Sequence, residues 1–257
     1  MRMHKLLPSA VSFLGIMLAS SAVVHAAAVN LNPTADAFVT TGPANNLATN
    51  NYGAGGSLGL SAVGLPKGEF QSVLRFDTSS AKSTFDGLYG TGLWNLQSVT
   101  LQLSATAVNN TNFNANSAGS FGVSWMQNDG WVEGTGTPNA PGSSGITYSS
   151  LQATFINPAA DEALGTFSYS GASSGTFVYT LSTTAGFTAD LMAGSLVSLR
   201  LSGADSAVSY LFNSREFGMT GNRPLLSITA VPEPGTVALL VLGGLLCAVR
   251  GRTRRRR

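Results

Sequence analysis

The stretch QSVTLQLSATAV, residues 97–108, alternates apolar and polar side chains from Val99 to Ala105. Successive side chains of a β-strand point to opposite faces, so this alternation predicts a strand with one buried and one polar face. The same two-residue period occurs in FQSVLRFD (70–77) and SLVSLRLSG (195–203). Similar short runs occur at residues 35–40, 119–126, 162–170, 175–182, 207–214 and 223–230.

Asn, Gly, Ser and Pro fill the segments between these runs. Short alternating strands separated by turn residues are typical of antiparallel sandwiches. We therefore predict an all-β fold built as a single antiparallel β-sandwich. Only residues 183–194, TTAGFTADLMAG, have a pattern that predicts a helical turn or two, and residues 41–57 and 127–145 are predicted to be long loops that are functional or mobile.

The central region, residues 27–229, contains neither histidine nor cysteine, because His4, His25 and Cys247 all lie outside it. This excludes a Cys or His nucleophile or base, a zinc site with N and S ligands, and a disulfide within the region. We therefore expect no catalytic residues, no cofactor and no enzymatic activity. A pair of carboxylates acting on a glycosidic bond is the one catalytic alternative that the composition leaves open.

Two short stretches match catalytic motifs but lack their context. Gly171–Gly175, GASSG, has the spacing of a nucleophile elbow, yet it lies between two strand patterns, so we predict a hairpin turn. Ser79–Lys82, SSAK, matches S-x-x-K without the motifs that accompany it in serine acyl enzymes, and we predict a loop.

The charge of the central region is acidic although the whole chain is formally +2. Residues 27–229 carry six basic and eleven acidic side chains, a net charge of −5. Because binding to nucleic acid depends on a basic surface, we exclude nucleic acid as a partner.

The first 26 residues have the layout of a secretory signal peptide. Arg2 and Lys5 are followed by an apolar run at residues 11–18, and Val24 and Ala26 occupy the −3 and −1 positions of a cleavage site. We expect cleavage after Ala26 and export of the protein.

The C-terminal segment, residues 230–257, contains Pro232-Glu233-Pro234, an apolar run at residues 236–249 and then six arginines. The apolar run is shorter than the roughly 20 residues of an untilted transmembrane helix, and arginines that follow such a run stay in the cytoplasm. The segment resembles the PEP-CTERM sorting signal of Gram-negative bacteria. The resemblance implies a transient anchor in the inner membrane, cutting near Pro232-Glu233-Pro234 by an exosortase-type enzyme, and delivery to the cell surface or beyond.

A second resemblance covers nearly all of the central region. The pieces that carry it, in chain order, are ADAFV (35–39), NNYG (50–53), LRFD (74–77), NDGWVEGTGTP (128–138), GITY (145–148), SRE (214–216) and RPLL (223–226). Together they are similar to the DNRLRE-type domain of exported bacterial proteins. The resemblance implies a jelly-roll-like β-sandwich at residues 27–229, related to carbohydrate-binding modules that include an alginate-binding kind. Many relatives have a tryptophan where this chain has Tyr148, and the family offers no catalytic motif to transfer.

The candidate ligand contacts are Tyr52, Arg75, Trp131 and Tyr148, since aromatic rings stack on sugars and arginine binds hydroxyl or carboxylate groups. For Trp131 the favoured alternative is an anchor that holds its loop to the core. For Arg75 and Arg215, the favoured alternative is a surface ion pair with the nearby Asp77 and Glu216.

No metal site is assigned, because the oxygen donors Asp36, Asn50, Asn51 and Asp77 lack the spacing of a known calcium loop. Three functions remain in competition. The leading one is a non-catalytic surface or matrix protein associated with exopolysaccharide. The second is a dedicated binding module for external, including acidic, polysaccharides, and the third is a carboxylate-dependent polysaccharide-cleaving enzyme.

Overall fold

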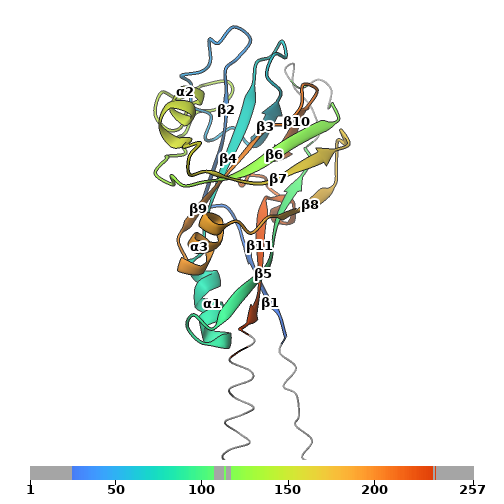
Figure 1. The fold of residues 1–257 in the computed structure, drawn as a ribbon. Helices are drawn as coiled ribbons and strands as arrows, with labels where there is room; N and C mark the ends of the chain where they lie inside the picture. The colour runs from blue at the N-terminus through green and yellow to red at the C-terminus, as the bar shows by residue number, and fades with distance from the viewer. Residues whose placement is uncertain (1–24, 107–112, 114–116, 234, 236–257) are drawn as a thin grey trace, which may run out of the picture. The chain divides into compact units, whose positions relative to one another are not determined.

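The computed structural model describes residues 25–106, 113, 117–233 and 235 (Figure 1). Two antiparallel sheets dominate these residues and few helices accompany them, which confirms the all-β prediction. Most of the predicted signal peptide, together with Pro234 and the apolar and arginine-rich parts of the C-terminal segment, lies outside the described residues. Within the described ranges, no helix has the length and apolar character that crossing a membrane requires.

The smaller sheet has four strands in the order β1, β11, β5, β8. Their bounds are Ala27–Leu31, Leu225–Pro232, Trp94–Ser104 and Thr176–Leu181. Strand β11 pairs with β1 on one side and with β5 on the other, so the two ends of the domain lie in the same sheet. Its last residue, Pro232, pairs with Trp94, and the Glu233 N–H donates to the carbonyl of Leu93 at 3.0 Å. The first two residues of the predicted processing motif therefore continue the sheet.

The larger sheet has seven strands and follows the order β10, β3, β4, β9, β6, β7, with β2 paired to β4. Their bounds are Ser209–Asn213, Ser57–Ser61, Phe70–Asp77, Leu196–Gly203, Gly119–Met126, Glu162–Tyr169 and, for β2, Ala35–Thr40. The predicted runs at 35–40, 70–77 and 119–126 coincide with β2, β4 and β6. Strands β1 and β3 were not predicted.

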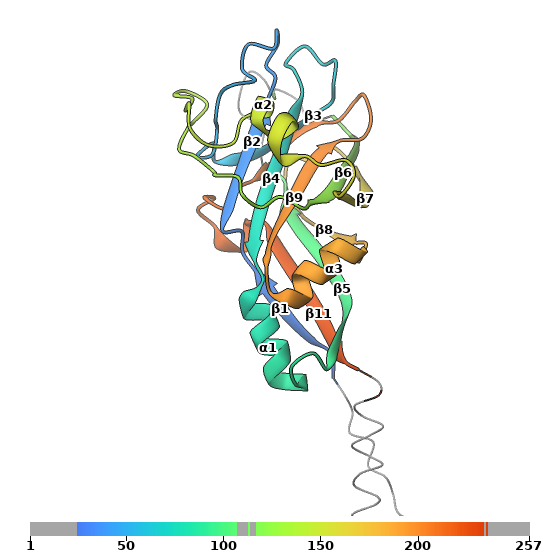
Figure 2. The same ribbon diagram turned by 60° about the vertical axis from the view of Figure 1, so that its left-hand side comes forward.

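Helical segments occupy four of the connections, one of them the short 3₁₀ turn Thr220–Asn222 between β10 and β11. Figure 2 shows α1 (Ser79–Tyr89) and α3 (Ala185–Ala193) near the ends of β1, β5 and β9, and α2 (Tyr148–Ser150), with the following turn at Leu151–Phe155, beside β2 and β4. The predicted helical turns at 183–194 correspond to α3.

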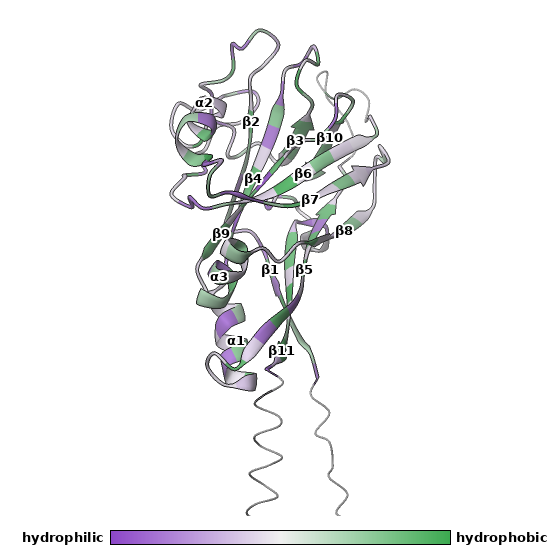
Figure 3. Ribbon diagram, viewed as in Figure 1, coloured by the Kyte–Doolittle hydropathy of each residue, from purple (hydrophilic) through white to green (hydrophobic). Residues whose placement is uncertain are grey.

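The main core lies between the two sheets. Figure 3 shows hydrophobic residues alternating with more hydrophilic ones along β4 and β5. Leu74 and Phe76 of β4 and Leu101 of β5 are fully buried members of this core. Burial of such side chains contributes about 1.5–3 kcal/mol each, and this term drives the two sheets together.

A second cluster covers the opposite face of the larger sheet. It contains Val73 of β4, Met126 of β6 and Trp131 from the loop that follows β6. Because of this cover, Gln71 is buried as well, so the predicted polar face of residues 70–77 is largely closed to solvent. The two-residue period identified the strand correctly, but it gave no sign that loops would pack on its second face.

Two local predictions are wrong. Ser79–Lys82 forms the first turn of α1 and is not a loop. The Asp77 carboxylate, just before the helix, accepts a hydrogen bond from the Ser79 N–H at 2.9 Å. Ala81 and Phe85, four residues apart, are the buried residues of the helix. Gly171–Gly175 does not form a hairpin, because β7 pairs with β6 in the larger sheet while β8 pairs with β5 in the smaller one. This loop therefore carries the chain from one sheet to the other.

Candidate functional site

Two of the predicted ligand contacts are buried in the protein. Tyr52 is 4% exposed and stacks on Phe38, with ring centroids 4.7 Å apart. Trp131 is 1% exposed, and its indole N–H donates to the Ser198 hydroxyl at 2.8 Å. Neither ring offers a face to a sugar in this structure, and Trp131 has the position of the loop anchor that was the favoured alternative.

Arg75 and Tyr148 are only partly covered, yet both have protein partners. Arg75 lies over the Trp131 ring, 4.9 Å from its centroid, and donates to the carbonyls of Asp129 and Trp131 at 2.9 and 2.7 Å. The expected ion pair with Asp77 is not formed, because the Asp77 carboxylate is at the start of α1. The Tyr148 hydroxyl donates to Glu69 at 2.5 Å, and burial and this carboxylate raise the pKa of Tyr148.

The two predicted long loops are joined by one side chain, that of Asn51. It is fully buried, and its Nδ2 donates to the carbonyls of Glu133 and Ile146 at 2.6 and 2.8 Å. Its Oδ1 accepts from the backbone N–H groups of Gly53 and Gly136 at 3.2 and 3.1 Å. A Cβ on Gly136 would lie 2.0 Å from the Asn51 carbonyl oxygen, so the loops meet as closely as backbone can. The two loops are therefore held together at a buried junction.

A charged cluster lies beside this junction, and we call Asp36, Glu133, Arg215 and Glu216 the Arg215 cluster. The Arg215 guanidinium binds both oxygens of Glu133, with Nε–Oε1 at 2.8 Å and Nη2–Oε2 at 2.6 Å, and its Nε also lies 2.9 Å from Glu216. Asp36 Oδ2 accepts from the Arg215 backbone N–H at 2.7 Å. The predicted Arg215–Glu216 pair is present, and Asp36 and Glu133 extend it into a network.

Asp36 is the member of the Arg215 cluster with the most altered chemistry. It is 1% exposed, and burial followed by repulsion from Glu216 raises its pKa from 3.8 to about 8. One carboxylate oxygen from each of Asp36, Glu133 and Glu216 lies within 4.8 Å of the others, a donor set that a hard cation prefers. The Arg215 guanidinium already supplies the positive charge that pairs with Glu133 and Glu216, so the cluster needs no metal ion to neutralise these carboxylates.

The pieces of the DNRLRE-type resemblance meet at this place. Asp36 belongs to the first piece, Asn51 to the second, Glu133 to the fourth and Arg215 to the sixth. The hydrogen bond between Asp36 and Arg215 spans 179 positions of the chain. The predicted ligand contacts were the aromatic residues of these pieces together with Arg75, and Glu133 was not among them. Only its position in the fourth piece could have indicated that Glu133 has a role.

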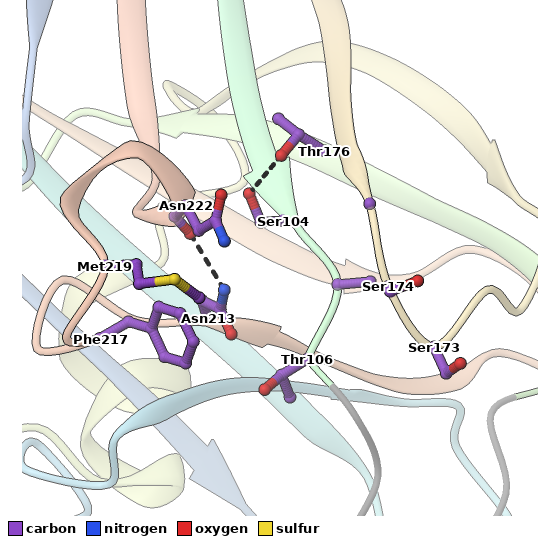
Figure 4. Close-up of a pocket in the computed structure, with 11 residues that line it drawn as sticks. Ser104, Thr106, Ser173, Ser174, Thr176, Asn213, Phe217, Met219 and Asn222 are labelled. Atoms are coloured by element: carbon purple, nitrogen blue, oxygen red, sulfur yellow. Dashed lines mark hydrogen bonds between the residues drawn. The ribbon is translucent and has the colours of Figure 1, made fainter.

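A cavity of about 340 Å³ lies elsewhere, where the ends of β5, β8 and β10 meet (Figure 4). Its size falls within the roughly 300–1,000 Å³ of small-molecule sites. The described residues that line it are Ser104, Ala105, Thr106, Ser173, Ser174, Gly175, Thr176, Asn213, Phe217, Met219 and Asn222. None of them was predicted as a contact, since serine, threonine and asparagine in turns look alike in a sequence whether or not they line a cavity.

Two backbone hydrogen bonds hold the walls of this cavity. The Ala105 N–H donates to the Gly175 carbonyl at 2.9 Å and extends the β5–β8 pairing, and the Thr106 N–H donates to the Leu211 carbonyl of β10 at 3.1 Å. The end of the chain that crosses from β7 to β8 is thereby held against β5, and the residue beyond β5 is held against β10. The segment 171–175, predicted as a hairpin, contributes part of the lining because it connects the two sheets.

Polar and apolar groups line different parts of the cavity. In Figure 4, Phe217 and Met219 lie on one side, Ser173 and Ser174 on the other, and Asn213 between them. Among the described residues, the lining thus combines hydroxyls, amides and one aromatic ring.

No protein-family model matches this chain. No curated protein matches its sequence either.

Proposed function

We propose that this protein is an exported, non-catalytic surface or matrix protein that associates with exopolysaccharide through the cavity at the β5, β8 and β10 ends. The single observation that carries the proposal is the lining of that cavity, in which hydroxyl and amide groups face an aromatic ring. The signal peptide and the PEP-CTERM-like tail support export and exosortase-dependent sorting. A dedicated binding module for external polysaccharides is the alternative with the same binding chemistry.

The Arg215 cluster argues against the enzyme alternative. A glycosidase needs two carboxyl groups that reach the scissile bond from opposite sides. Asp36 has the raised pKa of a general acid but is 1% exposed, and Glu133 is engaged by Arg215 through both oxygens. We therefore propose that this network stabilises the loops and takes no part in turnover.

The test uses the full-length protein on a panel of neutral and acidic polysaccharides, measured for retention and for release of reducing ends. We expect weak retention that increases when many copies share one surface, because effective concentration raises avidity. Release of sugar that disappears on changing one acidic residue would instead establish the enzyme. A protein retained by no polysaccharide in either format would refute the proposed association.

Export is tested on the native protein. The mass of surface material is expected to show a chain without residues 1–26 and cut near Pro232-Glu233-Pro234. A released protein that retains its arginine-rich tail would contradict sorting by an exosortase.

A further inference from the structure

We infer that the cavity selects neutral, hydroxyl-rich sugar units over uronic acids and other anionic sugars. This inference rests on the proposed function and names the ligand class of the same site. The alternative, binding of acidic polysaccharides, needs a positively charged side chain at the cavity.

No charged side chain is present among the described residues that line the cavity. A carboxylate entering it would lose water without gaining an opposite charge, which is unfavourable. Two arginines belong to the segment that forms one wall, but neither is among the described residues that line the cavity. Arg215 binds Glu133 and Glu216, and the Nε of Arg223 donates to the Phe217 carbonyl at 2.7 Å.

Asn213 supplies an independent argument about the ligand. It lines the cavity, is 2% exposed, and donates from Nδ2 to the Asn222 carbonyl at 3.1 Å. Its Oδ1 is buried and has no hydrogen-bond partner among the described residues. A buried acceptor without a donor is unfavourable, so a ligand that donates there after the Asn213 amide turns towards the cavity gains free energy. A sugar hydroxyl can donate this hydrogen bond, so Asn213 favours a hydroxyl-rich ligand.

The remaining lining groups fit a neutral sugar ring. Ser173 and Ser174 are exposed, and no hydrogen bond to another described residue uses their hydroxyls, so these groups can both donate and accept. Ser104 and Thr176 bond to each other at 2.9 Å and close one wall. Phe217 presents an apolar ring of the kind on which the C–H face of a pyranose packs.

The charge of the surrounding domain acts in the same direction. Residues 27–229 carry a net charge of −5, which repels a polyanion over distances of about one Debye length. Neutral polysaccharides meet no such barrier, so the local and the long-range electrostatics agree.

The experiment measures retention of the full-length protein in affinity gels that contain dextran or galactomannan, both neutral, or alginate or polygalacturonate, both acidic. We expect retardation by at least one neutral polymer and none by the acidic ones. In Phe217→Ala the retention should weaken about tenfold, the loss of one favourable ring contact. The matched control is Val178→Ala, an exposed apolar residue on β8, which should bind like the wild type. Unchanged far-ultraviolet circular dichroism and melting temperature establish that both variants are folded.

A second variant, Ser174→Arg, places a cation at the cavity and should create retention by alginate. This gain cannot come from unfolding. The wild type could instead be retained more strongly by acidic than by neutral polymers, and Phe217→Ala could abolish that retention. This result would overturn the proposed selectivity for neutral sugars but would still support polysaccharide binding at the cavity. Neutral retention that Phe217→Ala leaves unchanged would remove the cavity as the site. Absence of retention by all four polymers would overturn both proposals.

Discussion

The Arg215 cluster and the cavity are built in part from one short segment, yet they use their polar groups in opposite ways. Arg215 and Glu216 face the cluster, while Phe217, Met219 and Asn222 line the cavity. In the cluster every charge has an opposite charge or a backbone partner. In the cavity the polar groups are neutral, and Asn213 Oδ1 has no partner among the described residues. The charged residues of the cluster therefore bind one another and the backbone, whereas a neutral acceptor in the cavity has no partner among the described residues.

The largest expected effect is on the covered face of the larger sheet, next to the Arg215 cluster. Trp131→Ala removes a buried indole, its hydrogen bond to Ser198 and the ring beneath Arg75. We expect the free energy of unfolding to fall by about 3–5 kcal/mol. Urea denaturation followed by tryptophan fluorescence and circular dichroism measures this loss. The neighbouring Val132→Ala, at a side chain that is 66% exposed, should change it by no more than about 0.5 kcal/mol. Equal effects of the two substitutions would show that the loop is not anchored.

The second effect concerns the junction of the two loops. Asn51→Ala leaves two carbonyls and two N–H groups without their partner, and we expect a loss of about 2–3 kcal/mol. The matched control is Asn50→Ala, which loses one hydrogen bond, to the Tyr52 hydroxyl, and should cost at most about 1 kcal/mol. Thermal and urea unfolding give both values. If Asn51→Ala were as stable as the wild type, the loops would not depend on this side chain.

The third effect is a pH dependence that arises in the Arg215 cluster and that the neutral groups lining the cavity cannot produce. The pKa of Asp36 is about 8 in the folded protein and 3.8 as a free side chain, so the folded state holds a proton that the unfolded state releases. The Asp36 contribution is therefore fully present below pH 4 and is lost as the pH rises towards 8. The slope is about 1.4 kcal/mol per pH unit, so we expect a loss of about that size between pH 6 and pH 7.

Asp36→Asn isolates this contribution. Asparagine has the size of a protonated aspartic acid and still accepts from the Arg215 N–H, so the variant should fold and show a flatter stability profile. Urea midpoints of both proteins from pH 5 to pH 8 provide the measurement. Parallel profiles would mean that Asp36 does not retain its proton.

The smallest expected effect is at the cavity rim. Ser173→Ala and Ser174→Ala remove hydroxyls that bond to no described residue, so each should change stability by less than about 0.5 kcal/mol. Thermal unfolding of the two variants checks this. A loss above 1 kcal/mol would mean that these hydroxyls serve the fold as the cluster does, and the contrast between the two regions would disappear.

The sequence could predict little of either region as a site. Trp131 and Tyr52 were sensible candidates, because exposed aromatics are what a sugar site uses, but both rings lie in the folded core. The cavity lining lacks any local signal, since it consists of strand ends and turn residues that approach one another only after β5, β8 and β10 have taken their places.

The sequence by itself determined where most strands run and that the fold is all-β. Alternation is a local property, because the geometry of a strand turns each successive side chain to the other face, and so residues 35–40, 70–77 and 119–126 were found with correct bounds. Only the tertiary structure decided which sheet each strand joins, that loops cover Gln71 and Val73, and that Asp36 meets Arg215. These contacts join residues that are far apart in the chain. Their free energy comes from burial and pairing of side chains, which the alternation of neighbouring residues does not reveal.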